Sequence, residues 1–406
     1  MRALKKISFL HAADLHIDSP FQGLSTAPKH VFDDILESTY VSLNNLVELA
    51  IHKQVDFILL VGDIFDENIQ SLKAKVKLRQ AFETLQKHDI DVFLSYGNHD
   101  YEMTHDEMFS FPGNVHIFPS EEITHFAYYR NGKRLANIYG FSYEERVIKR
   151  NKAIDFELVD EEIPFHIAML HGSLKSNVDH DVYAPFQIRD LQRKHFDYWA
   201  LGHIHKREIL HENPYIVYPG NIQGRHIHES GEKGCYYVVM DEAEVSLDFM
   251  PLHAIEFTSM FLDLANCEDL YEAQQKVLEE LINIQSKKPQ LLQLIIKNDE
   301  QLIIEHGPEL DDFLDVIHEQ SLKQKEWQYI YSVKIEEYVV ESLAIGEHFI
   351  AQLAHEYEII DVHQSVEDLF NHRQGRKFLE RLDDEEKEEI KQQAKQMILK
   401  SLIGKE

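Results

Sequence analysis

The chain has 406 residues, of which 44% are hydrophobic and 28% are charged, and its formal net charge is −30. The length predicts two or three domains, and the composition is typical of a soluble globular protein. The acidity argues against an extended surface that coats nucleic acid, but not against a nuclease whose metal ions supply local positive charge. No apolar run reaches the ~18 residues needed to span a membrane.

The first residues and the two cysteines bear on the compartment. The basic stretch at residues 1–6 leads into a short apolar run that His11 and Asp14 interrupt, so we expect no export signal. Cys235 and Cys267 show no metal-type spacing and could form at most one disulfide. We therefore expect a cytoplasmic protein.

Apolar runs alternate with stretches of helical spacing over the first hundred residues. Strands are predicted at residues 7–13, 57–61 and 91–95, and helices at residues 32–51 and 71–87. The run at residues 57–61 is entirely apolar, as expected for a strand buried on both faces. This order predicts a parallel sheet covered by helices.

The middle of the chain is rich in short strands. They are predicted at residues 115–118, 123–129, 134–141, 166–170 and 196–201, with a β-rich stretch over residues 208–217 and 235–240. The residues Arg130-Asn131-Gly132-Lys133 are a hairpin turn signal. We expect a mixed sheet, or a second sheet packed on the first.

The pattern changes after Leu252. Strands are predicted at residues 257–264, 291–296 and 329–335, with helices at 268–284 and 310–320 between them. From Glu341 onward the pattern is helical, charged and without proline. We therefore predict three parts, which are residues 1–253, a small α/β module at 254–340, and a helical C-terminal region at 341–406.

Five of the predicted strands end in polar clusters. The clusters are Asp14-x-His16, Gly62-Asp63-x-x-Asp66, Gly97-Asn98-His99-Asp100, His171-Gly172 and Gly202-His203-x-His205. Any one of them alone would be explained as a polar turn or a surface loop. Because all five follow apolar strands in order, and ligands bind at the carboxyl ends of strands in α/β sheets, the set predicts one functional site.

The residue types in these clusters favour a two-metal site. Carboxylate, amide and imidazole groups without thiolate favour Mn²⁺ or Fe²⁺, with Zn²⁺ as a further candidate. Asp63 suits a carboxylate that bridges two ions about 3.5–4 Å apart. His203 and His205 point to the same side of an extended segment, so each can serve one metal. His99 would be the spare imidazole that protonates a leaving oxygen.

The five motifs over residues 7–252 resemble those of the calcineurin-like metallophosphoesterase superfamily. The resemblance implies a four-layer α/β/β/α sandwich with two divalent metal ions. It assigns one ion to Asp14, His16, Asp63 and His205, and the other to Asp63, Asn98, His171 and His203. It assigns catalysis to His99, with Asp100 as its supporting carboxylate. Asp66 falls at a second acidic position, where it would cap a helix, hydrogen-bond near the centre or bind a metal.

Within this superfamily the chain is most similar to DNA repair exonucleases, such as the nuclease subunit of bacterial SbcCD, and in architecture to bacterial YhaO-type proteins. The segments His11–Asp18 and Tyr218–Asn221 carry this resemblance, whereas the continuation at residues 221–226 departs from the usual pattern. It implies a DNA exonuclease or endonuclease, a homodimer, a capping domain after residue 253, and an SbcC-like coiled-coil ATPase bound to residues 341–406. The apolar stripes of that region are equally explained by packing on the body of the protein.

Two other functions fit the same motifs. One is a phosphatase or phosphodiesterase that acts on a small phosphoester, and the other is a DNA-end-binding scaffold subunit for an ATPase. The long extension after Leu252 favours the nuclease over the first, and the intact motif set argues against the second. Lys206 and Arg225 lie near motif residues and are candidates for substrate binding, although either would otherwise be an ordinary surface charge.

Overall fold

The computed structural model describes residues 5–21, 23–66, 71–105, 110–175, 183–264, 267, 269–284, 287–297, 310–323 and 325–336, and the single residues 387, 391 and 394. It separates into one unit of residues 1–21 and 27–336 and a second unit of residues 22–26 and 337–406. The predicted helical region at 341–406 therefore lies almost entirely outside the described residues. Within the described ranges, no helix combines the length and the hydropathy needed to cross a membrane.

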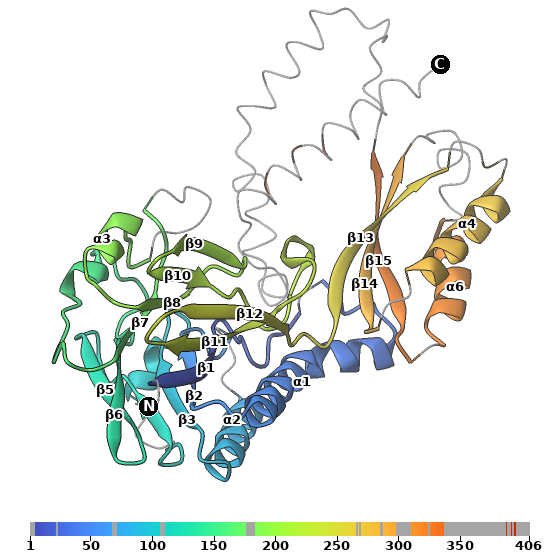
Figure 1. The fold of residues 1–406 in the computed structure, drawn as a ribbon. Coiled ribbons are helices and arrows are strands. Elements are labelled where there is room, and N and C mark those ends of the chain that lie inside the picture. Colours follow the sequence, from blue (N-terminus) through green and yellow to red (C-terminus); the bar gives the residue numbers. More distant parts are fainter. Residues whose placement is uncertain are drawn as a thin grey trace, which may run out of the picture. The chain divides into compact units, whose positions relative to one another are not determined.

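Two six-stranded sheets stack on each other in the first unit (Figure 1). The first sheet has the order β12 (Val245–Pro251), β11 (Gly234–Asp241), β1 (Lys6–Ala12), β2 (Phe57–Val61), β3 (Asp91–Ser95) and β4 (Val115–Ile117). The second has the order β5 (Thr124–Arg130), β6 (Lys133–Gly140), β7 (Phe165–His171), β8 (Tyr198–Gly202), β10 (Tyr215–Tyr218) and β9 (Glu208–Glu212). Four strands run parallel in each sheet, and antiparallel strands complete the edges.

Three apolar clusters hold the layers together. Helices α1 (Lys29–Lys53) and α2 (Leu72–Gln86) pack on the outer face of the first sheet. Between the sheets, Phe9 stacks on Phe57 with ring centroids 5.1 Å apart. The outer face of the second sheet is covered by loops, by η2 (Lys152–Asp155) and by the five-residue helix α3 (Ile188–Gln192). The predicted α/β/β/α sandwich is confirmed, with a thin outer layer on this side.

The β-rich stretch predicted at residues 208–217 is a hairpin of two strands. Strands β9 and β10 pair antiparallel, because Asn213-Pro214 forms the turn between them. The hairpin predicted at residues 130–133 joins β5 to β6, and both Asn131 (φ 53°) and Gly132 (φ 73°) adopt left-handed backbone. Two consecutive left-handed residues are the geometry of a type I′ turn, which matches the twist of the paired strands.

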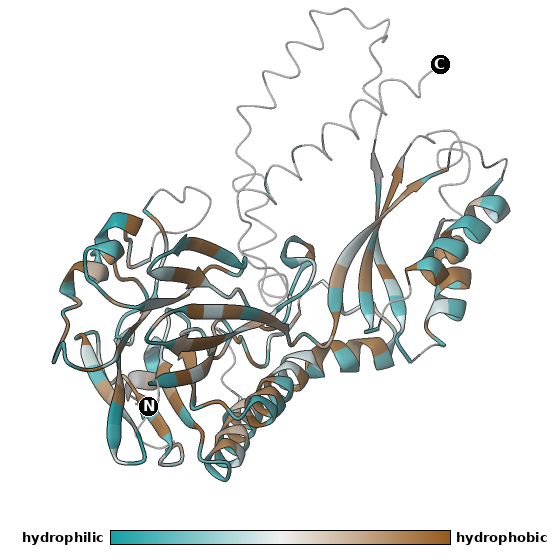
Figure 2. Cartoon of the chain, viewed as in Figure 1, coloured by the Kyte–Doolittle hydropathy of each residue, from teal (hydrophilic) through white to brown (hydrophobic). Residues whose placement is uncertain are grey.

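A three-stranded parallel sheet follows the sandwich. It has the order β13 (Glu256–Asp263), β14 (Gln290–Lys297) and β15 (Gln328–Glu336), and an apolar cluster joins it to α4 (Leu270–Asn283) and α6 (Leu310–Ser321). Both helices carry hydrophobic and hydrophilic residues along their length (Figure 2). The Nε1 of Trp327 donates to the carboxylate of Asp34 on α1 at 2.8 Å. The predicted strand–helix alternation is present, while the boundary at residue 253 stays a prediction.

Acid should destabilise the sandwich through His11. This fully buried ring bonds the hydroxyl of Tyr198 and the carbonyl of Leu201, each at 3.0 Å, and burial lowers its pKa from 6.5 to about 3. Below pH 6.5 the ring of His11 is protonated in the unfolded chain but stays neutral in the folded protein. The contribution of His11 to the free energy of unfolding is therefore complete above pH 6.5 and is lost as the pH falls toward 3.

We expect this histidine to remove about 2 kcal/mol from the free energy of unfolding between about pH 7.5 and about pH 5. Urea unfolding of the metal-free protein at both pH values measures the loss. The His11→Asn variant should be less stable at both but should show a correspondingly smaller difference between them. An unchanged difference would contradict the assignment.

Candidate metal centre

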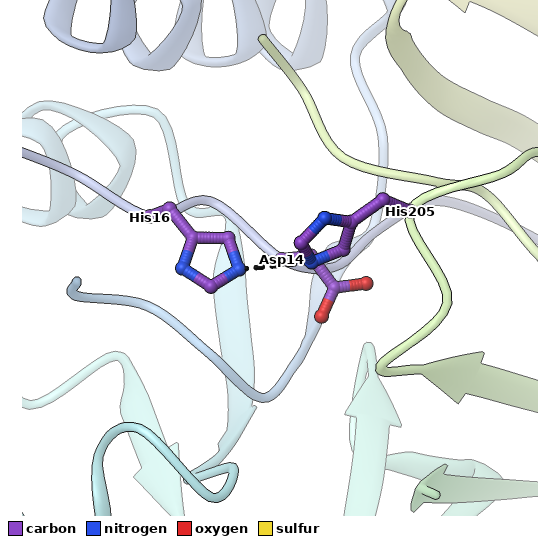
Figure 3. A group of neighbouring side chains, drawn as sticks. All are labelled: Asp14, His16 and His205. Carbon is purple, nitrogen blue, oxygen red and sulfur yellow. Dashed lines mark hydrogen bonds between the residues drawn. The ribbon is translucent and has the colours of Figure 1, made fainter. Parts of the chain in front are cut away.

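The five polar clusters meet where the parallel strands of the two sheets end. They bring together two groups of side chains, and within each group the ligand atoms lie within 4.8 Å of one another. The first ligand group is Asp14, His16 and His205 (Figure 3), and the second ligand group is Asp63, His171 and His203. Asn98 completes the predicted set, with its Oδ1 3.0 Å from Nε2 of His171. All seven predicted ligands are therefore in one place.

The first ligand group turns two imidazole nitrogens toward each other. The Nε2 atoms of His16 and His205 are 3.0 Å apart, as the dashed line in Figure 3 marks. Both oxygens of the buried Asp14 accept the backbone N–H of His203, at 3.0 and 3.1 Å. Converging nitrogen and carboxylate donors in a buried position suit a divalent cation.

Asp63 belongs to the second ligand group but also faces the first. Its Oδ2 is 3.3 Å from Nε2 of His171 and 4.0 Å from Nε2 of His16. Its Oδ1 accepts the backbone N–H of His99 at 3.0 Å. This is the position that a bridging carboxylate requires, since both groups are within reach of one side chain. The assignment of each ligand to an ion stays a prediction.

The backbone is strained at this site. Four of the candidate ligands adopt left-handed conformations, with φ of 51° at Asp14, 40° at His16, 49° at Asp63 and 97° at His203. Such values are rare outside glycine, and they persist where the surroundings hold them and function needs them. Here the N–H of Asp14 donates to the carbonyl of Gly62, and that of His16 to the carbonyl of Asp63, both at 3.1 Å.

Two glycines leave room for the ligands. A Cβ atom at Gly62 would lie 2.2 Å from Nδ1 of His171, and one at Gly97 would lie 2.2 Å from Oδ1 of Asp63. Gly62 also has a left-handed φ of 75°. The glycines that follow β2 and β3 are therefore required by the close approach of side chains, in addition to the turn that each strand makes.

The charges of the centre favour a bound cation. Burial, and Asp63 nearby, raise the pKa of Asp14 well above its usual range. Burial opposes ionisation of Asp63 too, but His171 and His99 hold its pKa well below the usual range. Although burial lowers the pKa of His171, Asp63 and Asp14 raise it to about 9. Without metal, Asp14 and His171 thus tend to hold protons. Because metal ligands bind in their deprotonated forms, divalent ions would displace these protons. The donor set fits a pair of metal ions.

The structure corrects the prediction that Asp100 orients the ring of His99. The carboxylate of Asp100 accepts the backbone N–H groups of Ile64, Phe65 and Gly97, at 2.8, 2.9 and 3.1 Å. Among the residues that the structure describes, the buried Nδ1 of His99 has no hydrogen-bond partner. Because β2 and β3 are neighbours, Asp100 is directed to the loop that carries Asp63 instead. Burial raises the pKa of Asp100 to about 6.

The remaining predicted residues differ in their position. Asp66 does not cap the next helix, since Ser71 caps α2; instead its Oδ2 lies 3.1 Å from the guanidinium of Arg225. Burial lowers the pKa values of His16 and His205, and the charge of Arg225 adds to this, while the same charge partly opposes the raised pKa of Asp14. Lys206 is exposed on the loop after β8.

Sequence reasoning missed one residue of the centre, Glu229. It belongs to η3 (Ile227–Glu229) in the loop between β10 and β11, and its Oε1 lies 2.5 Å from Nδ1 of His205. Burial opposes ionisation, but His205 holds the pKa of Glu229 well below its usual range. It does not directly follow the end of a strand, so the sequence carries no signal that separates it from a surface carboxylate.

Comparison with known proteins agrees with this geometry. A sequence model described as calcineurin-like phosphoesterase matches residues 7–207. The uncharacterized metallophosphoesterase YhaO of Bacillus subtilis is 37% identical over 401 residues, which is 98% of each chain. This chain belongs to the calcineurin-like metallophosphoesterase family. The phosphoesterase is therefore a hydrolase with a dinuclear metal centre, and the two ligand groups are its candidate sites.

More distant relatives are named as DNA repair proteins. The DNA double-strand break repair protein Mre11 of Sulfurisphaera tokodaii is 26% identical over 217 residues, which is 51% of each chain. The Mre11 protein of Methanocaldococcus jannaschii is 25% identical over 262 residues, which is 61% of the phosphoesterase and 66% of that protein. The phosphoesterase thus spans only part of the length of these repair proteins.

Proposed function

We propose that the phosphoesterase is a nuclease that hydrolyses phosphodiester bonds of DNA in DNA repair, with Mn²⁺ as its preferred metal. The observation that carries the proposal is the similarity to Mre11 repair proteins, in a chain that also assembles the two ligand groups. Oxygen and nitrogen donors without thiolate support Mn²⁺ over softer metals. The α/β module at residues 256–336 supports a large substrate over a small phosphoester.

Two side chains, His99 and Arg225, would act on the substrate in this reaction, and Asp66 would hold Arg225. When bound, the two metal ions polarise the phosphoryl group and lower the pKa of a water molecule. The ring of His99 is 24% exposed at the edge of the centre, with Nε2 3.9 Å from Oδ2 of Asp63, so it can reach the leaving oxygen and donate a proton. Arg225, held by Asp66, offers a guanidinium to the non-bridging phosphate oxygens.

The test is a comparison of three substrates at one metal concentration. Purified phosphoesterase with Mn²⁺ is mixed with linear duplex DNA, single-stranded DNA and a chromogenic phosphodiester, with EDTA as the control. We expect EDTA-sensitive cleavage of DNA, and closed circular duplex shows whether it needs an end. Cleavage of the chromogenic ester alone would make the protein a small-molecule phosphodiesterase. DNA binding without cleavage of any substrate would make it a scaffold.

The proposed partners rest on the same similarity. A nuclease of this kind is proposed to act as a homodimer and to bind an SbcC-like coiled-coil ATPase. The region predicted to dock the ATPase, residues 341–406, lies outside the described part of the chain except at three positions. Both partners stay predictions.

A further inference from the structure

A buried carboxylate stands behind the first ligand group. Glu229 is 5% exposed, and its two oxygens have different partners. Oε1 lies 2.5 Å from Nδ1 of His205, and the half-exposed ring of His226 approaches the same oxygen at 3.4 Å. Oε2 accepts the side-chain amide of Asn221 and the backbone N–H of Arg225, both at 2.7 Å. Oε1 therefore contacts the metal-facing histidine, with the guanidinium of Arg225 4.0 Å away, while Oε2 accepts hydrogen bonds from the loop.

The contact at Oε1 decides which nitrogen of His205 carries the hydrogen. An ionised carboxylate can only accept, so Nδ1 donates and Nε2 keeps its lone pair. That Nε2 is the atom that faces His16 in the first ligand group, 3.0 Å from its Nε2. A carboxylate in this position also fixes the orientation of the ring and increases the basicity of the metal-binding nitrogen.

The second ligand group is supported in another way. The Nδ1 of His171 lies 3.0 Å from the main-chain carbonyl of Val61, so its hydrogen is fixed by the backbone of β2. No side-chain substitution removes that carbonyl. The two ligand groups therefore differ, because a single side chain supports His205 while the main chain supports His171.

We propose that Glu229 is a positioning residue that sets the metal affinity of the first ligand group alone. This rests on the dinuclear centre and is independent of which phosphoester is cleaved. In Glu229→Gln, the donors of Asn221 and Arg225 hold the amide oxygen, so the amide NH₂ faces His205. The Nδ1 of His205 must then accept a hydrogen bond, and the ring hydrogen moves to Nε2. Nε2 then has no lone pair with which to bind a metal ion.

The tautomer is measurable without any metal. Nitrogen-15 NMR of the histidine-labelled, metal-free protein distinguishes the two forms of a neutral ring, and the signal of His205 is identified by its loss in His205→Gln. We expect the hydrogen on Nδ1 in the wild type and on Nε2 in Glu229→Gln. A wild-type ring with its hydrogen on Nε2 overturns the proposal, even if the Glu229 variant does not fold.

Metal affinity gives the second readout. In calorimetric titration with Mn²⁺, Glu229→Gln should bind one of the two ions about 10–100-fold more weakly and the other normally. Electron paramagnetic resonance at limiting Mn²⁺ should change from the spectrum of a coupled pair to that of an isolated ion. The matched control is Asn221→Ala, which removes a loop bond to Oε2 and leaves the His205 contact intact; it should bind both ions normally.

Three results would contradict the proposal. Wild-type affinity for both ions in Glu229→Gln would show that the contact does not matter to the metal. Equal weakening of both ions would show that Glu229 supports the whole centre. The same loss in Asn221→Ala would reduce Glu229 to a residue that folds the loop. Because all readouts are tautomers and affinities, they stand or fall separately from the cleavage of DNA.

Discussion

Replacing His99 with leucine is expected to reduce turnover by about 10² to 10⁴-fold while both metal ions stay bound. The ring lies edge-on to His16, with centroids 5.1 Å apart, yet it belongs to neither ligand group. Its partial exposure beside Asp63 leaves the ring accessible to a substrate, as the proposed role of a proton donor requires. The loss is that of general-acid assistance, so the metal content should not follow it.

The experiment measures turnover and metal content on the same preparation of His99→Leu. His116→Leu is the matched control. This ring is also partly exposed, but it stacks against Phe93 on β3 and belongs to neither ligand group. The control should keep both activity and metal. Loss of metal in proportion to activity would make His99 a ligand, and near-normal turnover would remove it from the mechanism.

Replacing Asp63 with asparagine should have the largest effect on the metals. Its Oδ2 lies within 4.0 Å of histidines from both ligand groups. An amide supplies one neutral oxygen where the carboxylate supplies two charged ones, so neither ion keeps its bridge. Metal ions contribute several kcal/mol to the transition state, so we expect turnover to fall by at least about 10³-fold.

Metal analysis after gel filtration measures the occupancy of Asp63→Asn, and both ions should be depleted. Asp56→Asn is the control, since Asp56 precedes the same strand, β2, and its carboxylate bonds the backbone N–H of Ser8 at 2.8 Å and the hydroxyl of Tyr128 at 2.7 Å. It tests loss of a largely buried carboxylate at the other end of that strand. Two ions bound with full activity in Asp63→Asn would refute the bridge.

The sequence predicts best where burial is uniform. The runs at residues 57–61 and 91–95 coincide with β2 and β3, because central parallel strands are apolar on both faces. Strand β12 was not predicted, since it is an edge strand whose side chains are half-buried or exposed and show no apolar run. Local pattern therefore missed this edge of the first sheet, although it indicated the edge strands β4 and β5.

The site shows the same division between local and distant contacts. The seven candidate ligands follow strand ends, so the order of strands was enough to bring them together. The partner of Asp100 depends on how two neighbouring loops pack, and sequence proximity to His99 pointed to the wrong one. Glu229 reaches His205 only after the chain has passed through β9 and β10, and such a return leaves no trace in local spacing.

The position of β11 has a consequence for synthesis of the protein. One edge of β1 pairs with β2, and its other edge pairs with β11, where Leu10 lies opposite Tyr237. This second edge cannot pair until Tyr237 has been synthesised and has left the ribosome. At about 5–20 residues per second this takes roughly tens of seconds, during which a strand edge is open to wrong pairing. The segment that closes it follows directly on the loop of Glu229. A nascent chain that has just emerged to residue 207, where the family match ends, carries all seven ligands but neither closure nor that carboxylate. Full metal affinity of the first ligand group is therefore expected only after residues 229–241 have emerged.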